Sequence, residues 1–155
     1  MRYFTFLFII LLLACSKEVK IDIPQEEAKI VIDGRIELGG APLVLLMQSQ
    51  YLYSPTNLGA YFSSNISNAN VTLVRDLDTF SLSPYLISEL PLQSQITLAE
   101  QLNVELNELA FFPLKVYSSL DPNLVGAVGQ TYTLNVQYDN QTYSATTKLL
   151  VPVGL

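Results

Sequence analysis

The most regular alternation of apolar and polar residues lies near the end of the chain. Residues 130–138 and 141–150 both alternate, and Asp139 and Asn140 between them tolerate the positive φ of a tight hairpin turn. A two-residue turn fixes how the two strands pair. The expected opposite pairs are Val136 with Tyr143, Leu134 with Ala145, Tyr132 with Thr147, Gln137 with Thr142, Asn135 with Ser144 and Thr133 with Thr146. One face is then largely apolar and the other polar, which predicts a sheet with one buried side.

A second alternating segment lies earlier in the chain. Residues 29–38 place isoleucine or leucine on one side and Asp33, Arg35 and Glu37 on the other, which is typical of a half-buried strand. Gly34 stands on the apolar side, where we expect it to mark a bulge.

Residues 43–47 differ, because they form a continuous apolar run of strand length after the turn at 39–42. We expect this strand to be buried on both faces. The residues between 51 and 68 predict a long loop. Shorter strands are predicted at 70–74, 79–82 and 114–117, with a hairpin at 75–78 and a turn at 121–123.

The period changes between residues 93 and 112. Leucines recur at helical spacing at positions 98, 102, 106 and 109, and Thr97 with Glu100 fits a capping box. These residues predict a helix over 98–110 inside a helical insertion at about 93–112.

Together these segments predict an all-β domain over residues 29–155. Six or seven short strands with one helical insertion favour an immunoglobulin-like antiparallel β-sandwich, although the cysteine and tryptophan signature of true immunoglobulin domains is missing.

The first 14 residues predict a signal peptide. Arg2 is followed by an apolar run from Tyr3 to Leu13, interrupted by Thr5, and this run is roughly half of the 20 or so residues that a membrane span needs. We expect residues 1–14 to direct export and then to be removed.

The cleavage region resembles a lipobox, in which a small residue precedes a cysteine that receives a lipid. Here Leu12, Leu13 and Ala14 lead to Cys15, the single cysteine of the chain. Lipidation of Cys15 anchors the mature protein in a membrane and removes a free thiol. Residues 15–28 are expected to form a lipidated tether. The alternative is that Cys15 is a small apolar residue of the signal.

Composition narrows the class of function. The chain has 14% charged residues, against about 25% in typical soluble proteins, and no histidine. Removing Arg2 with the signal changes the formal charge from −6 to −7, which disfavours binding to nucleic acid.

The lack of histidine also disfavours most catalytic and metal sites, so we expect no catalytic residues, no metal and no cofactor. Carboxylate pairs remain the enzymatic alternative, and aspartates are the alternative for calcium. Turn and capping chemistry explains these residues more simply. The carboxylates considered are Glu26 with Glu27, Glu105 with Glu108, Asp76 with Asp78, Asp121 and Asp139.

Four aromatic residues in the predicted loop are candidates for partner contact, because exposed aromatic side chains on loops often form binding hot spots. They are Tyr51, Tyr53, Tyr61 and Phe62. Packing in the core is the better interpretation of each.

Several motifs together resemble a Bacteroidota outer-membrane lipoprotein family of unknown function, domain-of-unknown-function family 4249. They cover most of the mature chain, while residues 86–112 look like an insertion, and the step Pro152-Val153 comes earlier than the usual end. The chain is therefore either a fragment that holds the N-terminal domain or a natural short form. The motifs are Cys15-Ser16-Lys17-Glu18, Ile21-Asp22-Ile23-Pro24, residues 29–36, 42–45 and 69–73, and residues 126–134 running into 143–147.

The resemblance implies a lipoprotein of the outer membrane that is often encoded near a TonB-dependent receptor. It implies a sandwich domain with an accessory role in capture or import, and it brings no catalytic residues. We therefore expect a non-catalytic binding or accessory module, lipid-anchored in the outer membrane, with exposure at the cell surface or in the inner leaflet both left open. The alternative is a surface adhesion or spacer module, and a glycan- or peptide-processing enzyme ranks third.

Overall fold

The computed structural model describes residues 27–50 and 57–151. The predicted signal peptide at 1–14 and nearly all of the predicted tether at 15–28 lie outside these ranges.

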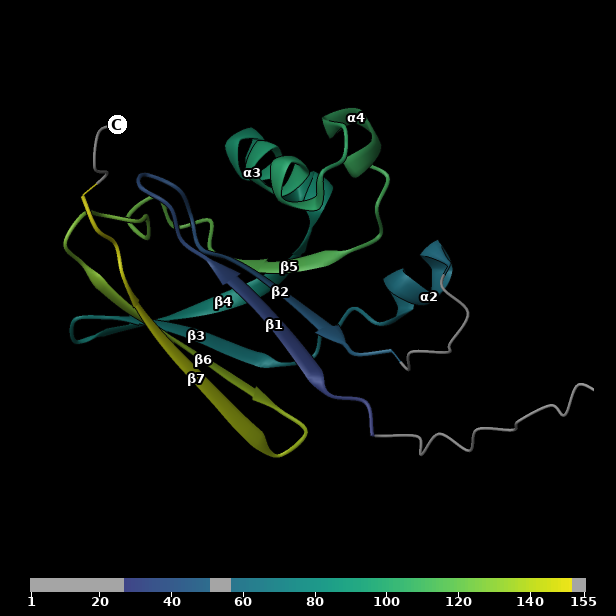
Figure 1. Cartoon of the computed structure of the whole chain (residues 1–155). Helices are drawn as coiled ribbons and strands as arrows, with labels where there is room; N and C mark the ends of the chain where they lie inside the picture. Colours follow the sequence, from purple (N-terminus) through teal and green to yellow (C-terminus); the bar gives the residue numbers. More distant parts are fainter. Residues whose placement is uncertain (1–26, 51–56, 152–155) are drawn as a thin grey trace, which may run out of the picture.

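The described residues form one 7-stranded antiparallel sheet with short helices on one side (Figure 1). The strand order is β1-β2-β5-β4-β3-β6-β7. The strands are β1 (Ile30–Arg35), β2 (Leu43–Gln48), β3 (Asn70–Arg75), β4 (Asp78–Leu86), β5 (Lys115–Ser118), β6 (Thr131–Tyr138) and β7 (Gln141–Lys148). The helices are α2 (Leu58–Ser63), the short 3₁₀ helix η1 (Ile87–Glu89), α3 (Leu92–Leu102) and α4 (Leu106–Leu109). The predicted all-β class is confirmed.

Strand β4 makes the sheet curl, because its two halves have different neighbours. Residues 78–82 pair with β3, whereas residues 83–86 pair with β5. The sheet therefore folds into two layers that share β4. One layer holds β1, β2 and β5, and the other holds β3, β6 and β7.

The two layers enclose a cluster of buried side chains, the inner core. It contains Val44 and Leu46 from β2, Val71 and Leu73 from β3, and Val136 from β6. Burying an aliphatic side chain of this size stabilises a fold by about 1.5–3 kcal/mol. Contacts across the inner core therefore hold the layers together.

Two tyrosines in the inner core have buried hydroxyl groups with backbone partners. The Tyr117 hydroxyl accepts a hydrogen bond from the Ala69 N–H at 2.8 Å, and burial raises the pKa of its phenol. The Tyr132 hydroxyl accepts from the Ala127 N–H and donates to the Val125 carbonyl. Both tyrosines attach the connections between strands to the core.

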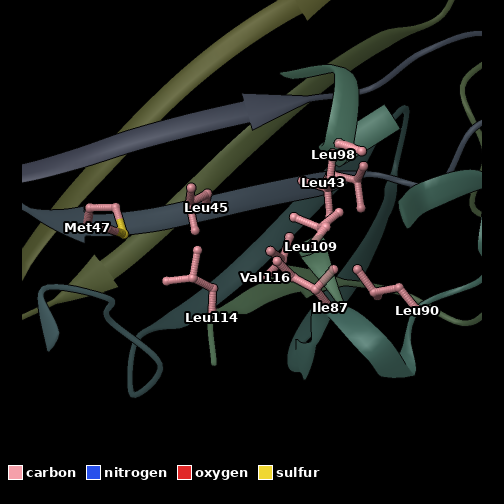
Figure 2. Packing of buried hydrophobic residues seen from close by; sticks show 10 residues of the cluster. Leu43, Leu45, Met47, Ile87, Leu90, Leu98, Leu109, Leu114 and Val116 are labelled. Carbon is pink, nitrogen blue, oxygen red and sulfur yellow. The ribbon is translucent and has the colours of Figure 1, made fainter. Parts of the chain in front are cut away.

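The outer face of β2 packs against the helices, as Figure 2 shows. Leu43, Leu45 and Met47 contact residues of η1, α3, α4 and β5 there. We name this cluster the outer core, and it further includes Ile87, Leu90, Leu98, Ala99, Leu109, Leu114 and Val116. The prediction that 43–47 is buried on both faces is confirmed.

The predicted helix over 98–110 is wrong in its bounds. Helix α3 begins at Leu92 and ends at Leu102, because the next residue, Asn103, has a left-handed φ of 53°, and α4 follows as a separate turn. Thr97 lies inside α3, so it caps nothing, and the capping box is also wrong. The leucine spacing continued across the break because both helices bury leucines in the outer core.

The predicted loop between 51 and 68 contains a helix, α2. Its start is marked by Asn57, whose side-chain oxygen accepts a hydrogen bond from the Ala60 N–H at 2.8 Å. A helix of six residues is too short to show apolar residues recurring at helical spacing. The N-cap residue Asn57 was therefore the one sequence signal for its start.

Gly34 does not mark a bulge, because β1 and β2 pair without interruption from Ile30 to Arg35. A Cβ at Gly34 would lie 2.9 Å from Cδ2 of Leu134 in the opposite layer. Glycine at this position lets the Leu134 side chain approach β1.

The predicted register of the last hairpin is confirmed at every pair. Asp139 and Asn140 have φ of 50° and 58°, the positive values expected for the turn. The apolar face of this hairpin is less buried on β7 than expected, since Tyr143 is half-buried while Ala145 and Thr147 are exposed. They are exposed because β7 is the last strand of the sheet and its outer edge has no neighbour strand among the described residues.

Asn65 joins β2 to β5, two strands whose backbone pairing is limited to Val44 with Tyr117. Its amide nitrogen donates to the Leu46 and Lys115 carbonyls, and its amide oxygen accepts from the Lys115 N–H at 2.8 Å. The side chain thus supplies the hydrogen bonds that a longer ladder would have made.

We expect Asn65→Ala to lower the free energy of unfolding by about 2–3 kcal/mol, because it leaves backbone groups without partners. The matched control is Asn70→Ala, whose exposed side chain donates to Gln137. It should cost less than about 1 kcal/mol. Urea unfolding measures both, and equal losses would contradict the role of Asn65.

Gly126 is the glycine with the closest backbone contact, since a Cβ there would lie 2.0 Å from the Glu37 carbonyl oxygen. It also accepts from the Gly39 N–H at 2.8 Å and donates to the Gly40 carbonyl at 2.9 Å. The segment before β6 is thereby fixed to the turn that follows β1.

We predict that Gly126→Ala destabilises the fold by at least about 2 kcal/mol, because backbone rather than a side chain must move. Gly34→Ala is the control, since its Cβ meets side chains alone, the ends of Leu134 and Val44, and it should cost clearly less. Thermal unfolding of both variants compares them. The explanation fails if Gly34→Ala is the more damaging change.

Candidate functional site

A groove of about 270 Å³ lies between β1 and β7, the strands at the two ends of the sheet. We name it the seam groove. Its surface is mostly apolar, and Arg35 is the one charged residue in its lining. The lining residues are Ile32, Gly34, Arg35, Ile36, Pro42, Val44, Leu73, Tyr132, Leu134, Val136 and residues 143–147.

On the β7 side of the seam groove, the strand edge is not paired with any other strand that the structure describes. In a hairpin with a two-residue turn, the residues that flank the turn exchange backbone hydrogen bonds, and such pairs alternate along the ladder. Alternate residues of β7 therefore direct their backbone groups away from β6, and these are Thr142, Ser144, Thr146 and Lys148. Lys148 is the one charged residue of β7, and the strand has no proline. Edges of this kind accept an additional strand readily.

A second candidate surface lies on α2 and after α4. Leu58 and Tyr61 are 68% and 38% exposed, and Phe111 is 86% exposed. We name these three residues the aromatic patch. Phe62 and Phe112, which neighbour Tyr61 and Phe111 in the sequence, have their rings 5.2 Å apart, and the Tyr61 ring lies 5.9 Å from that of Phe62. The contact between Phe62 and Phe112 joins α2 to the segment after α4, and an exposed apolar surface at such a junction is typical of a protein contact site.

The four predicted contact residues separate in the structure. Tyr61 belongs to the aromatic patch, and Phe62 packs against the outer core. Tyr51 and Tyr53 lie outside the described residues. Phe111 was not selected from the sequence, because an apolar residue next to a predicted helix suggests burial. The signal for its exposure was its position two residues after Leu109, the last leucine at helical spacing.

The acidic candidates lie on the surface. Asp76, Asp78, Asp121, Asp139, Glu105 and Glu108 are all exposed, as is Glu27, and Glu26 lies outside the described residues. Asp76 and Asp139 occupy hairpin turns at positive φ, and Asp121 accepts from Asn123 in a turn. Within residues 27–50 and 57–151, no three His, Cys, Asp or Glu side chains are grouped so that they could hold a metal ion.

The predicted anchor cannot be placed, because Leu12, Leu13, Ala14 and Cys15 lie outside the described residues. Among the helices within the described ranges, none combines the length and the apolar character that a bilayer crossing requires.

Comparison with known proteins identifies the family. No curated protein and no solved structure matches the chain. A sequence profile of one family matches residues 16–154, which is most of the chain and includes every strand of the sheet. The chain therefore belongs to the family described as a domain of unknown function, DUF4249.

Proposed function

We propose that this chain is a non-catalytic lipoprotein of the bacterial outer membrane, held by a lipid on Cys15. It acts as a binding or accessory module beside a TonB-dependent receptor or another nutrient uptake system. The lipobox at Leu12 to Cys15 supports the anchor, and the family match begins at residue 16, directly after that cysteine.

The proposal includes an immunoglobulin-like sandwich. In the constant type, strands A, B, E and D form one sheet and strands C, F and G the other. The order β1-β2-β5-β4 followed by β3-β6-β7 corresponds to it, with β4 serving as D and joining the sheets. Tyr132 near the start of β6 bonds back to Val125 and Ala127, in the manner of the tyrosine corner near the start of strand F.

The aromatic patch is the surface we assign to partner contact, and the exposure of Phe111 is the observation that carries this assignment. An exposed phenylalanine gains about 1.5–3 kcal/mol when a partner buries it. The contact between Phe62 and Phe112 joins α2 to the segment after α4, so the backbone that carries the patch is fixed before a partner binds.

Co-purification tests this function. The tagged full chain, produced in its own bacterium and solubilised in detergent, should retain an outer-membrane protein. Phe111→Ser should weaken that retention by about 30-fold, as expected for a hot spot worth about 2 kcal/mol. The control is Leu92→Ser, which removes an equally apolar side chain, 63% exposed, from α3.

Retention that is the same for the unchanged protein and Phe111→Ser would reject the aromatic patch. Failure to retain any membrane protein, with lost surface attachment in a deletion strain, would instead support the adhesion or spacer alternative. Mass spectrometry tests the anchor separately, since Cys15 should carry acyl chains in the unchanged protein and Cys15→Ser should carry none.

A further inference from the structure

A cavity of about 250 Å³ lies where the end of β1, the start of α3 and the segment between β5 and β6 meet. We name it the α3 pocket. It shares no residue with the aromatic patch. The lining residues that carry charged, polar or apolar groups toward a ligand include Arg35, Glu37, Leu43, Ser94, Leu120 and Asp121.

The first turn of α3 brings unsatisfied hydrogen-bond donors to the α3 pocket. Helix α3 begins after Pro91 without a side-chain cap, so backbone N–H groups of its first turn have no acceptor within the helix. These groups and the dipole of the helix favour a negative charge beside them. Gln93 and Ser94 belong to this turn, and both line the pocket.

The Ser94 side chain gives independent evidence for a ligand. Ser94 is 7% exposed and lines the pocket, and its hydroxyl has no hydrogen-bond partner within residues 27–50 and 57–151. A buried hydroxyl without a partner is costly, and a ligand that accepts its hydrogen bond removes that cost. The pocket therefore offers a second donor, next to the helix start, to a negatively charged group.

Arg35 adds a positive charge to the same lining. Its Nε lies 3.5 Å from Asp33 Oδ1, and its side chain is 45% exposed. Its terminal nitrogens have no partner in the part of the chain that the structure describes. A guanidinium group binds a carboxylate through two parallel hydrogen bonds. Arg35, Ser94 and the first turn of α3 together favour a carboxylate.

Two acidic side chains in the lining oppose a ligand that carries only negative charge. Glu37 follows Arg35 by two residues, and its carboxylate has no partner among the described residues. Asp121 accepts two hydrogen bonds from Asn123 through Oδ1, which leaves Oδ2 without a partner there. These carboxylates repel a simple anion, and Arg35 repels a simple cation. A zwitterion satisfies the groups of both signs.

The remaining surface of the pocket is mainly apolar. Leu43, which Figure 2 shows beside Leu98 of α3, is 4% exposed, and Leu120 is 53% exposed. Both leucines offer surface against which an aliphatic side chain can be buried. If each non-hydrogen atom takes about the 30 Å³ of a water molecule, the pocket holds about eight of them. This is the size of a free amino acid with a branched aliphatic side chain.

We propose that the α3 pocket binds a free α-amino acid with a branched aliphatic side chain, such as leucine. The ligand carboxylate binds Arg35, the Ser94 hydroxyl and the first turn of α3. The ligand ammonium group binds Glu37 and Asp121, and the side chain lies on the apolar lining. The pocket needs neither the lipid anchor nor a partner at the aromatic patch, so this inference goes beyond the proposed function and can fail separately from it.

Equilibrium dialysis of leucine against the full chain, purified in detergent, tests the class of ligand. Leucine should bind saturably, with a Kd of about 1 mM or tighter. Isocaproate is leucine without its ammonium group, and isoamylamine is leucine without its carboxylate, so each should bind at least about 10-fold more weakly. The proposal is overturned if leucine shows no saturable binding or if either analogue binds as well as leucine.

Arg35→Gln and Ser94→Ala test where leucine binds. Arg35→Gln should weaken binding at least about 10-fold and Ser94→Ala about 5-fold, because each change removes a donor to the carboxylate. The matched controls are Lys148→Gln and Ser81→Ala, exposed positions outside the pocket lining, which should bind leucine as the unchanged chain does. Leucine binding that persists unchanged in Arg35→Gln and Ser94→Ala would place it elsewhere and overturn the proposal.

Glu37→Gln separates a role in binding the ammonium group from a role in the fold. It should weaken leucine binding about 5-fold, while isocaproate should bind at least as well as before, because the repulsion between two negative charges is removed. A change that damages the pocket as a whole would weaken both ligands alike. That result would contradict the assignment of Glu37 to the ammonium group.

Discussion

Burial of β2 on both faces is the constraint on which the rest of the structure depends. Its five apolar residues, 43–47, have no solvent-facing side, so each face needs a cover. The second layer of the sheet covers one face and the helices cover the other. A sheet folded on itself could bury only the inner face of β2. The helical segment between β4 and β5 is therefore part of the core, and it is present because a two-sided strand requires it.

The layers also need a link where ordinary strand pairing stops. Between β2 and β5 the backbone ladder is short, and Asn65 completes it with a side chain. Tyr117 and Tyr132 use their hydroxyl groups in a comparable way, to hold connections against the inner core. These three polar side chains thus substitute for missing backbone partners, and the hydrogen bonds make their polar atoms compatible with a largely apolar interior.

Local patterns predicted the parts of the fold that are determined locally. The register of β6 and β7 follows from a two-residue turn, and the burial of β2 follows from its composition. The bounds of the helices could not be predicted in this way. Leucines before and after Asn103 both pack in the outer core, so their spacing did not reveal that the helix ends there. The prediction of a bulge at Gly34 was wrong, because the need for glycine there comes from the close approach of Leu134, a hundred residues away in the sequence. The seam groove could not be predicted for the same reason, because it forms between strands β1 and β7, which are distant in the sequence. The aromatic patch was half predicted, through Tyr61, because exposure of Phe111 depends on where α4 ends.

The division of β4 between the layers has a consequence for how the domain opens. If either layer were to detach, it would pull away the half of β4 that pairs with it. The other layer would then have a broken β4 strand at its edge, and the inner core would be exposed to solvent. Partial opening is therefore nearly as costly as complete unfolding, and we expect the domain to melt in a single step. Proteases cut mainly at segments that open by themselves. Within residues 27–50 and 57–151, a sheet built around one shared strand offers them few such places.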